Sequence, residues 1–194
     1  MSADEIAGFY RNIADYLKSF QRPVVDRLQP GLLDEEIQNQ TEPLPFVLPE
    51  EVVALYRCAN GTRTQKGDML GNLYFFPGFY FLSLEDACAR YKAMQSAEDW
   101  KKNWFPVFAN GGGDFYAAVC STEASQTAEI IGYLQGETDQ PVEFLSLTRL
   151  LECLDRCFRE GVFWVNRAGQ LDTNDGKQEA IAKELNPGLK VYEE

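Results

Sequence analysis

The stretch from Trp104 to Tyr116, WFPVFANGGGDFY, joins two apolar segments through a polar, glycine-rich run. Residues 105–108 are aromatic and β-branched apart from one proline, and they predict a strand. Residues 110–114 predict a turn, because glycine adopts the positive φ angles that tight hairpins require. Two further strands are predicted at 115–120 and 129–134. Their links are too short for parallel crossovers, so the segment predicts an antiparallel meander.

Helices are predicted on both sides of these strands. The ranges with helical spacing or capping signals are 5–21, 33–40, the segment from Leu48-Pro49 to Asn60-Gly61, 83–97, 146–160 and 176–185. Asn60-Gly61 is expected to end its helix through left-handed residues. Additional short strands are predicted at 70–76, 79–82 and 162–165. Helices first, strands in the middle and a helix after them indicate an α+β class, not βαβ alternation. We therefore expect an antiparallel, mixed-order sheet flanked by helices.

The chain length of 194 residues suits one domain with modest terminal additions. We expect an N-terminal helical extension over residues 1–30 and a single α+β domain over 31–165. A polar C-terminal tail with a short helix is expected over 166–194.

The charge balance is strongly acidic. There are 18 lysines and arginines against 30 aspartates and glutamates, which gives a formal net charge of −12. Such a surface disfavours nucleic acid and anionic membranes, because phosphate binding depends on basic side chains. It favours a basic partner, although net negative charge also serves solubility alone, and both interpretations remain open. The sequence has no targeting signal and no apolar run of the roughly 18 residues that a membrane span needs, which predicts a cytoplasmic location.

Histidine is absent from the chain, which excludes Ser-His-Asp and Cys-His catalysis and HExxH zinc sites. The glycine run at 110–114 lacks the Gly-Lys-Ser/Thr of a phosphate-binding loop, and residues 172–176 depart from the calcium-loop pattern. Cysteines stand at five positions without a CxxC pair, which favours core packing in a reducing compartment: Cys58, Cys88, Cys120, Cys153 and Cys157. We expect no catalytic site, no cofactor and no metal. An enzyme acting through paired carboxylates remains as an alternative that no motif singles out.

Residues 121–148 carry acidic side chains but no lysine or arginine. The acidic residues of this stretch are Glu123, Glu129, Glu137, Asp139 and Glu143. Several of them are expected to share one exposed face that meets a basic partner; the alternative is a solvated sheet face with its loop. Tyr80, Tyr116 and Tyr133 are candidates for exposed aromatic anchors of the partner, although tyrosines at strand positions more often belong to the core or to cross-strand pairs.

Three segments taken in order, Leu48–Gly61, Phe76–Ala87 and Trp104–Tyr116, resemble the SUKH superfamily (Smi/Knr-like) over roughly residues 33–160. The residues that carry this resemblance are Pro49, Asn60, Gly61, Gly78, Trp104, Pro106, Gly113 and Asp114. The resemblance implies an α+β fold with helices around an antiparallel sheet. Asp114 is expected to be structural, with its carboxylate satisfying turn amides.

The resemblance also implies a binding role. The superfamily includes bacterial immunity proteins that neutralise toxins, often nucleases, delivered between competing cells, and fungal regulators of cell-wall assembly. It implies a non-enzymatic protein whose partner is a basic toxin domain. The alternative is a regulatory or scaffolding module with an endogenous partner, such as one in cell-wall regulation.

Overall fold

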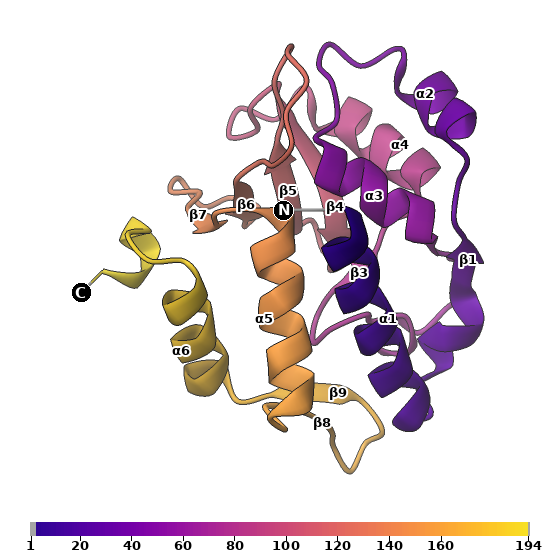
Figure 1. Cartoon of the computed structure of the whole chain (residues 1–194), viewed down its shortest axis with the longest axis vertical. Helices are drawn as coiled ribbons and strands as arrows, with labels where there is room; N and C mark the ends of the chain where they lie inside the picture. The colour runs from indigo at the N-terminus through magenta and orange to yellow at the C-terminus, as the bar shows by residue number, and fades with distance from the viewer. Residues whose placement is uncertain (1–2, 194) are drawn as a thin grey trace.

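Five strands form the main sheet of the computed structural model, which describes residues 3–193. The strands are β3 (Tyr80–Phe81), β4 (Trp104–Ala109), β5 (Phe115–Val119), β6 (Ile130–Tyr133) and β7 (Val142–Phe144). Each pairs antiparallel with the next, and the hairpin predicted from the WFPVFANGGGDFY stretch is the β4–β5 pair (Figure 1). The α+β class and the antiparallel sheet are confirmed. The strands follow chain order instead of the expected mixed order, because each connection returns the chain to the neighbouring position in the sheet.

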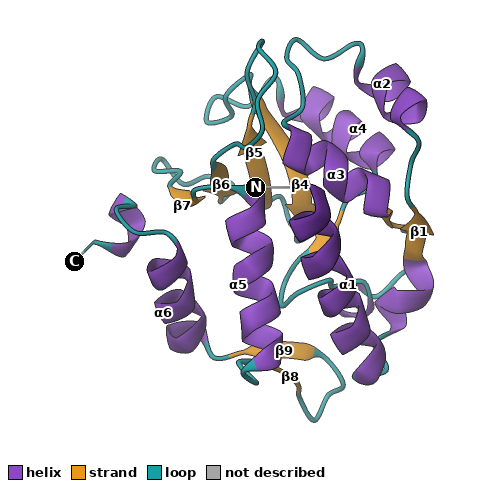
Figure 2. Cartoon of the chain, viewed as in Figure 1, coloured by secondary structure: helices purple, strands orange, loops and turns teal. Residues whose placement is uncertain are grey.

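The helices lie where helical periodicity predicts them. They are α1 (Ala3–Ser19), α2 (Asp34–Thr41), α3 (Glu50–Cys58), α4 (Leu84–Met94), α5 (Leu147–Arg159) and α6 (Asp175–Leu185). Helix α1 packs against both α3 and α5, and α6 packs on the other side of α5 (Figure 2). Helix α4 packs on β4. The apolar stripe of α5 is buried in the common core, as expected for a strongly amphipathic helix.

Side-chain caps fix where three of these helices begin. Ser83 Oγ accepts a hydrogen bond from the Asp86 amide at 3.1 Å, and Ser146 Oγ accepts one from the Arg149 amide at 3.1 Å. Asn174 Oδ1 does the same for the Lys177 amide at 3.0 Å. Each cap satisfies an amide that has no partner within its own helix, so the boundaries follow from local sequence.

The strand predicted at residues 70–76 is wrong. This segment contains the 3₁₀ turn η2 (Leu70–Asn72) followed by Phe75 and Phe76, which are buried at 0% and 2% exposure. Both rings pack against Phe108 of β4. The apolar residues of this segment are therefore explained by burial in the core. A buried turn requires the same apolar composition as a strand, although it forms no strand hydrogen bonds in the sheet.

Two small antiparallel pairs lie outside the main sheet. Strand β1 (Leu28–Pro30) pairs with β2 (Ala59–Thr62), and β8 (Phe163–Val165) pairs with β9 (Leu171–Thr173). The β8 strand is a run of aromatic and β-branched residues and matches the range expected at 162–165. Strands β1, β7 and β9 have the same length, but each includes a polar residue and gives no such run.

The expectation that Asn60-Gly61 ends the third helix is also wrong, because both residues belong to β2. Asn60 Oδ1 accepts a hydrogen bond from the Leu84 amide at 2.8 Å, so it satisfies the start of α4. Gly61 has φ of 63°, and a Cβ there would lie 2.3 Å from the carbonyl carbon of Leu82. Strand β2 therefore lies in close contact with the turn that leads into α4. The short distance at position 61 requires glycine, because there is no room for a side chain.

Glu51 joins three separate segments of the fold. Its side chain is buried, and Oε1 accepts hydrogen bonds from the amides of Ala128 and Leu147, both at 2.9 Å. Oε2 accepts two more from the amide and hydroxyl of Thr148, both at 3.0 Å. A carboxylate on α3 thus satisfies the first amides of α5, where the helix dipole favours negative charge.

We expect Glu51→Gln to lower the free energy of unfolding by about 2 kcal/mol, because an amide NH₂ would face amide donors that need an acceptor. The matched control is Glu50→Gln, its exposed neighbour, whose ion pair with Arg57 is expected to contribute no more than about 1 kcal/mol. Urea denaturation at neutral pH measures both. Equal losses in the two variants would contradict the role given to Glu51.

The close approach at Gly61 gives a second prediction. Gly61→Ala is expected to cost about 3 kcal/mol or more, because it adds a clash with the Leu82 backbone to the strain of positive φ. Gly67→Ala is the control, since Gly67 also has positive φ (95°) but open space around its Cα. It is expected to cost about 1 kcal/mol. Thermal unfolding of both variants compares them, and similar melting temperatures would argue against the clash.

Candidate partner-binding surface

A groove of about 580 Å³ lies between the β6–β7 loop and the C-terminal segment. Its lining residues are Leu134, Glu137, Asp139, Pro141, Val142, Gly188, Leu189, Lys190 and Val191. Leu134 and Val191 are 47% and 39% exposed, so two large apolar side chains border the groove. The groove therefore combines apolar walls with two carboxylates and one lysine, Lys190.

Gln140 holds the β6–β7 wall of the groove in shape. Its Nε2 donates hydrogen bonds to the carbonyls of Leu134 and Glu137 at 2.8 and 2.7 Å. Its Oε1 accepts one from the Leu134 amide at 2.8 Å. The Gln140 side chain thus satisfies backbone groups of the loop that have no strand partner. It thereby holds the segment that carries Glu137 in place.

The opposite wall is tied to the edge strand β7. Asn186, 0% exposed, accepts a hydrogen bond from the Leu145 amide at 2.9 Å and donates one to the Ala182 carbonyl at 2.8 Å. Tyr192, in the 3₁₀ turn η3 (Lys190–Tyr192), donates its hydroxyl to the Glu143 carbonyl at 3.0 Å. These contacts hold residues 188–191 beside the sheet edge.

The glycine-rich turn of the β4–β5 hairpin supports the same loop. Asp114 Oδ1 accepts a hydrogen bond from the Gln135 amide at 3.0 Å, and Oδ2 accepts one from Asn110 Nδ2 at 2.6 Å. Asn110 Oδ1 in turn accepts hydrogen bonds from the amides of Gly112 and Asp114. A Cβ at Gly113 would lie 1.9 Å from Gln135 Oε1. The Gly-Asp motif therefore positions the start of the β6–β7 loop.

The remaining residues of the three motifs lie at structural positions. Pro49 precedes the first turn of α3, and Gly78 adopts φ of 85° in the turn before β3. Trp104 is 2% exposed and packs edge-to-face on Trp100. Pro106, which cannot donate to a ladder, lies where the β4–β5 register shifts.

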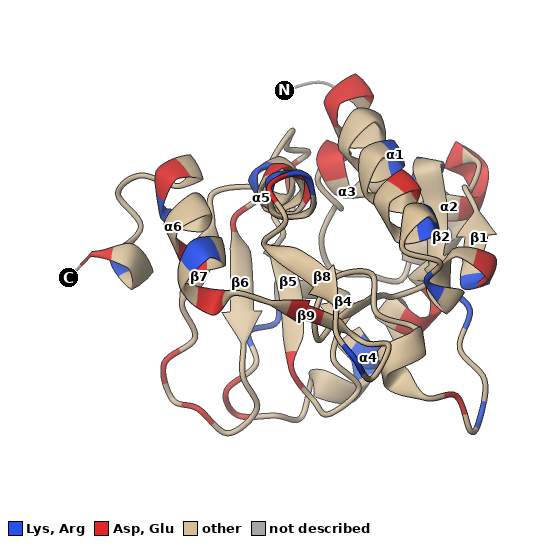
Figure 3. Cartoon of the chain, turned by 90° about the horizontal axis from the view of Figure 1, so that it is seen from below, with Lys and Arg blue, Asp and Glu red and all other residues tan. Residues whose placement is uncertain are grey.

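The structure brings together two of the five acidic residues singled out from the sequence. Glu137 and Asp139 both line the groove. Glu123 and Glu129 are exposed at the opposite end of β6, because the β5–β6 and β6–β7 loops leave this strand in opposite directions. Figure 3 shows acidic positions on the loops that extend beyond β5 and β6. Of the acidic residues expected to share one face, Glu137 and Asp139 therefore do so at the groove.

Glu143 faces a separate pocket of about 290 Å³, which Tyr116, Glu179 and Tyr192 also line. Burial raises the pKa of Glu143, and a hydrogen bond with Tyr116 opposes this shift. The pKa of Tyr116 is raised by burial and by the nearby Glu143 carboxylate. Glu143 is thus a partly desolvated residue of the β7–α6 contact, not part of the groove.

Two of the three tyrosines considered as exposed anchors are buried. Tyr80 is 5% and Tyr133 is 1% exposed, and Tyr116 is half-buried beside Phe79 and Phe144. The core reading of these strand tyrosines is therefore confirmed for Tyr80 and Tyr133, because their sheet positions point into the core. The sequence did not identify Leu134 and Val191 as groove residues. The one sequence feature that marks them is an apolar residue next to turn residues.

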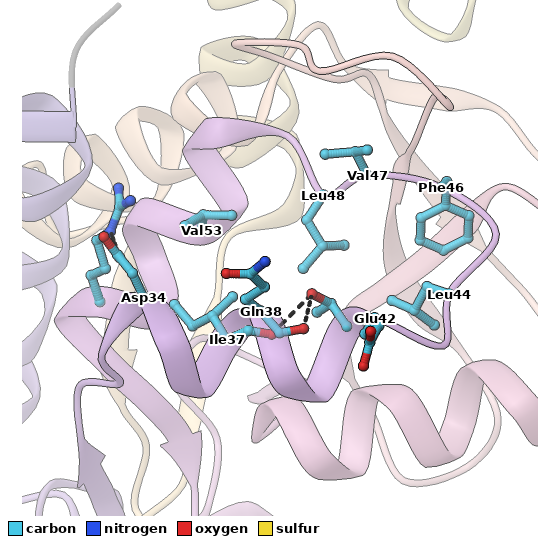
Figure 4. Close-up of a pocket in the computed structure, with 11 residues that line it drawn as sticks. Asp34, Ile37, Gln38, Glu42, Leu44, Phe46, Val47, Leu48 and Val53 are labelled. Atoms are coloured by element: carbon cyan, nitrogen blue, oxygen red, sulfur yellow. Dashed lines mark hydrogen bonds and ion pairs between the residues drawn. The ribbon is translucent and has the colours of Figure 1, made fainter.

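A second hollow, of about 550 Å³, lies between α2 and α3 (Figure 4). Ile37 and Val53 line it together with Val47, which is 45% exposed. At its rim Arg57 pairs with Asp34 at 2.6 Å and with Glu50. This hollow is suited to an apolar side chain, since its basic residue is already paired.

Across residues 3–193, no group of three or more histidine, cysteine, aspartate or glutamate side chains has the arrangement of a metal site. Within the same range, no helix is long and apolar enough to cross a membrane. The described cysteines are free thiols.

The fold is an α+β unit in which helices surround an antiparallel meander. A profile of the SMI1/KNR4 family (SUKH-1) matches residues 31–152, more than half of the chain. The chain belongs to this family, which confirms the SUKH resemblance. No protein among curated sequences matches the chain. Helix α1, most of α5 and the 188–191 wall of the groove lie outside the matched range.

The raised pKa of Glu143 predicts a pH dependence of stability. Because the folded-state pKa lies above the ordinary value of 4.5, the unfolded chain loses this proton first, and stability falls as pH rises through that window. We expect Glu143→Gln to gain stability relative to wild type between pH 4 and pH 7. Glu137→Gln, at an exposed position of the preceding loop, is the control and is expected to show no such gain. Denaturant titrations at both pH values measure the difference, and a gain that shrinks with pH would contradict it.

Proposed function

We propose that this chain is a non-enzymatic, cytoplasmic immunity protein that binds and neutralises a basic toxin domain, such as a nuclease. The observation that carries the proposal is the groove, in which exposed apolar side chains are bordered by Glu137 and Asp139. Membership of the SMI1/KNR4 family, which includes immunity proteins, supports a binding role.

The charge distribution suits a basic partner. The net charge of −12 accelerates the approach of a cationic surface over distances up to about a Debye length. At contact, the two carboxylates of the groove pair with lysine or arginine side chains, while Leu134 and Val191 lose apolar surface to the partner. Charge then gives orientation and rate, and apolar burial gives residence time.

Neutralisation follows from the same chemistry. A nuclease holds its substrate by basic side chains along the phosphate path. A rigid loop that presents carboxylates to those side chains occupies the path and excludes nucleic acid. No catalytic step by this chain is required.

A regulatory or scaffolding module with an endogenous partner is the second candidate. One observation favours it: the α2–α3 hollow lies entirely within the range that the family profile matches, whereas the 188–191 wall of the groove does not. A role shared by the wider family would use the α2–α3 hollow.

The groove is tested by the double variant Glu137→Lys/Asp139→Lys. Tagged wild-type chain first captures the partner from source lysate, and the purified partner is then titrated against each variant at low and high salt. We expect affinity to fall at least about tenfold at low salt, with a weaker salt dependence, because attractive pairs become repulsive.

The matched control is Glu123→Lys/Glu129→Lys, which changes net charge by the same amount at the other end of β6. It is expected to keep most of the affinity. Equal weakening by both double variants would show that only long-range charge matters, which would contradict the groove. Co-expression separates the two functions: growth rescue from a toxic partner supports immunity, and a captured cell-wall or signalling protein without toxicity supports the regulatory module.

A further inference from the structure

The C-terminal residues 186–192, here called the tail segment, separate two cavities. On one side lies the groove, and on the other lies the pocket of about 290 Å³ that Glu143 lines. Val191 lines both cavities, so the tail segment is a wall that they share. Figure 1 shows this segment in yellow between α6 and the C-terminus. A change in how the tail segment is held at the pocket therefore also changes the groove.

Side-chain hydrogen bonds attach the tail segment to the edge strand β7. The Leu145 amide donates to Asn186 Oδ1 at 2.9 Å, and the Tyr192 hydroxyl donates to the Glu143 carbonyl at 3.0 Å. The Tyr192 amide bonds locally to the Leu189 carbonyl at 3.0 Å. These attachments are not part of the pairing between β6 and β7. The tail segment can therefore leave β7 while the sheet stays intact.

The carboxyl group of Glu143 lies between the sheet and this tail segment. Gly132 of β6 leaves room for it, since a Cβ at position 132 would lie 1.9 Å from Glu143 Oε1. The Tyr116 hydroxyl of β5 donates a hydrogen bond to the carboxyl group. On the outer side, α6 and the tail segment cover it. The carboxyl group is thus hydrated less than it would be on an open strand edge.

The titratable groups around Glu143 are acidic or neutral. Asp175 and Glu179 of α6 and Tyr192 of the tail segment line the same pocket. Helix α5 contributes Cys153, a free and fully buried thiol, which is neutral in such surroundings. Among residues 3–193, no lysine or arginine lines the pocket. Ionisation of Glu143 therefore places a negative charge beside two other carboxylates, without a basic side chain in the pocket to offset it.

We propose that Glu143 is a protonation switch for the tail segment: the neutral carboxyl group holds the tail segment on β7, and the ionised group loosens it. Poor hydration and the like charge on α6 both oppose ionisation while the tail segment is docked. Release of the tail segment admits water and lets the carboxylates move apart. Docking is therefore coupled to proton uptake.

The direction of the pH dependence follows from the burial of Glu143. Burial raises the pKa of this group above the ordinary value of 4.5 in the docked state. After release the carboxyl group is in water and regains an ordinary pKa. The stabilisation of docking by the proton is thus complete below pH 4.5 and is lost as pH rises through the docked-state pKa. The tail segment is held least firmly near neutral pH.

The switch has a consequence for the groove. Leu189 and Val191 belong to the wall that the tail segment supplies, so loosening this segment loosens the wall. In acid a partner meets a groove of fixed shape, and near neutral pH it meets a wall that adjusts to it. This consequence rests on the proposed function, whereas the switch is a property of the chain alone.

Amide hydrogen exchange of the full ¹⁵N-labelled chain, followed by NMR between about pH 4 and pH 7, tests the switch without a partner. The Leu145 amide reports docking, because Asn186 protects it, and the Ala117 amide in the middle of the sheet reports global unfolding. We expect the protection factor of Leu145, corrected for the intrinsic exchange rate, to fall at least about threefold across this range. It is expected to stay below that of Ala117 throughout, because the tail segment opens separately.

Three variants assign the effect to a residue. Glu143→Gln removes the titrating group and is expected to keep the Leu145 protection factor constant within about twofold. Glu179→Gln removes one facing carboxylate and is expected to reduce the fall by about half, which keeps the switch testable if the first variant does not fold. Glu137→Gln, on the opposite wall of the groove, is the matched control and is expected to retain the full fall.

Three outcomes would overturn the switch. They are a Leu145 protection factor that does not change with pH, a fall that persists in Glu143→Gln, and equal protection factors for Leu145 and Ala117. Equal factors would mean that the tail segment leaves β7 only when the whole chain unfolds. The exchange measurements use no partner, so their failure leaves the proposed function intact, and failure of the groove variants leaves the switch intact.

Discussion

The carboxylate of Glu51 is the constraint on which the arrangement of the molecule depends. It connects α3 to the first turn of α5 and to the entry of β6, through four hydrogen bonds in a buried setting. Because α5 follows β7 directly, a fixed start of α5 also fixes the edge of the sheet. Helices α1 and α6 then pack on opposite sides of α5, and the chain continues from α6 into the tail wall of the groove.

The family motifs affect the candidate surface indirectly, through the residues that they hold in place. Asp114 and Gly113 make no contribution to the groove lining, yet they hold Gln135 and so determine where Leu134 and Glu137 lie. Asn60 and Gly61 likewise set the start of α4 without forming a site. Such a scaffold keeps loop geometry constant while the side chains on the loop are free to suit different partners.

Sequence reasoning succeeded where the signal is local. Helical periodicity and capping residues located α1 to α6, and the glycine-rich turn located the β4–β5 hairpin. It failed at residues 70–76, because an apolar run is equally compatible with a buried turn. It grouped five acidic residues by their position along the chain, whereas the two loops around β6 point in opposite directions. The groove itself joins residues near 137 to residues near 190, and no local pattern reports such a contact.

The negative charge of this chain has two physically different uses. Glu137 and Asp139 are exposed, so salt screens them, and their contribution concerns the rate and direction of approach. Glu51 is buried and hydrogen-bonded, so salt screens it little, and its charge serves the fold. A basic partner that reaches the groove alone would bind with strong salt dependence.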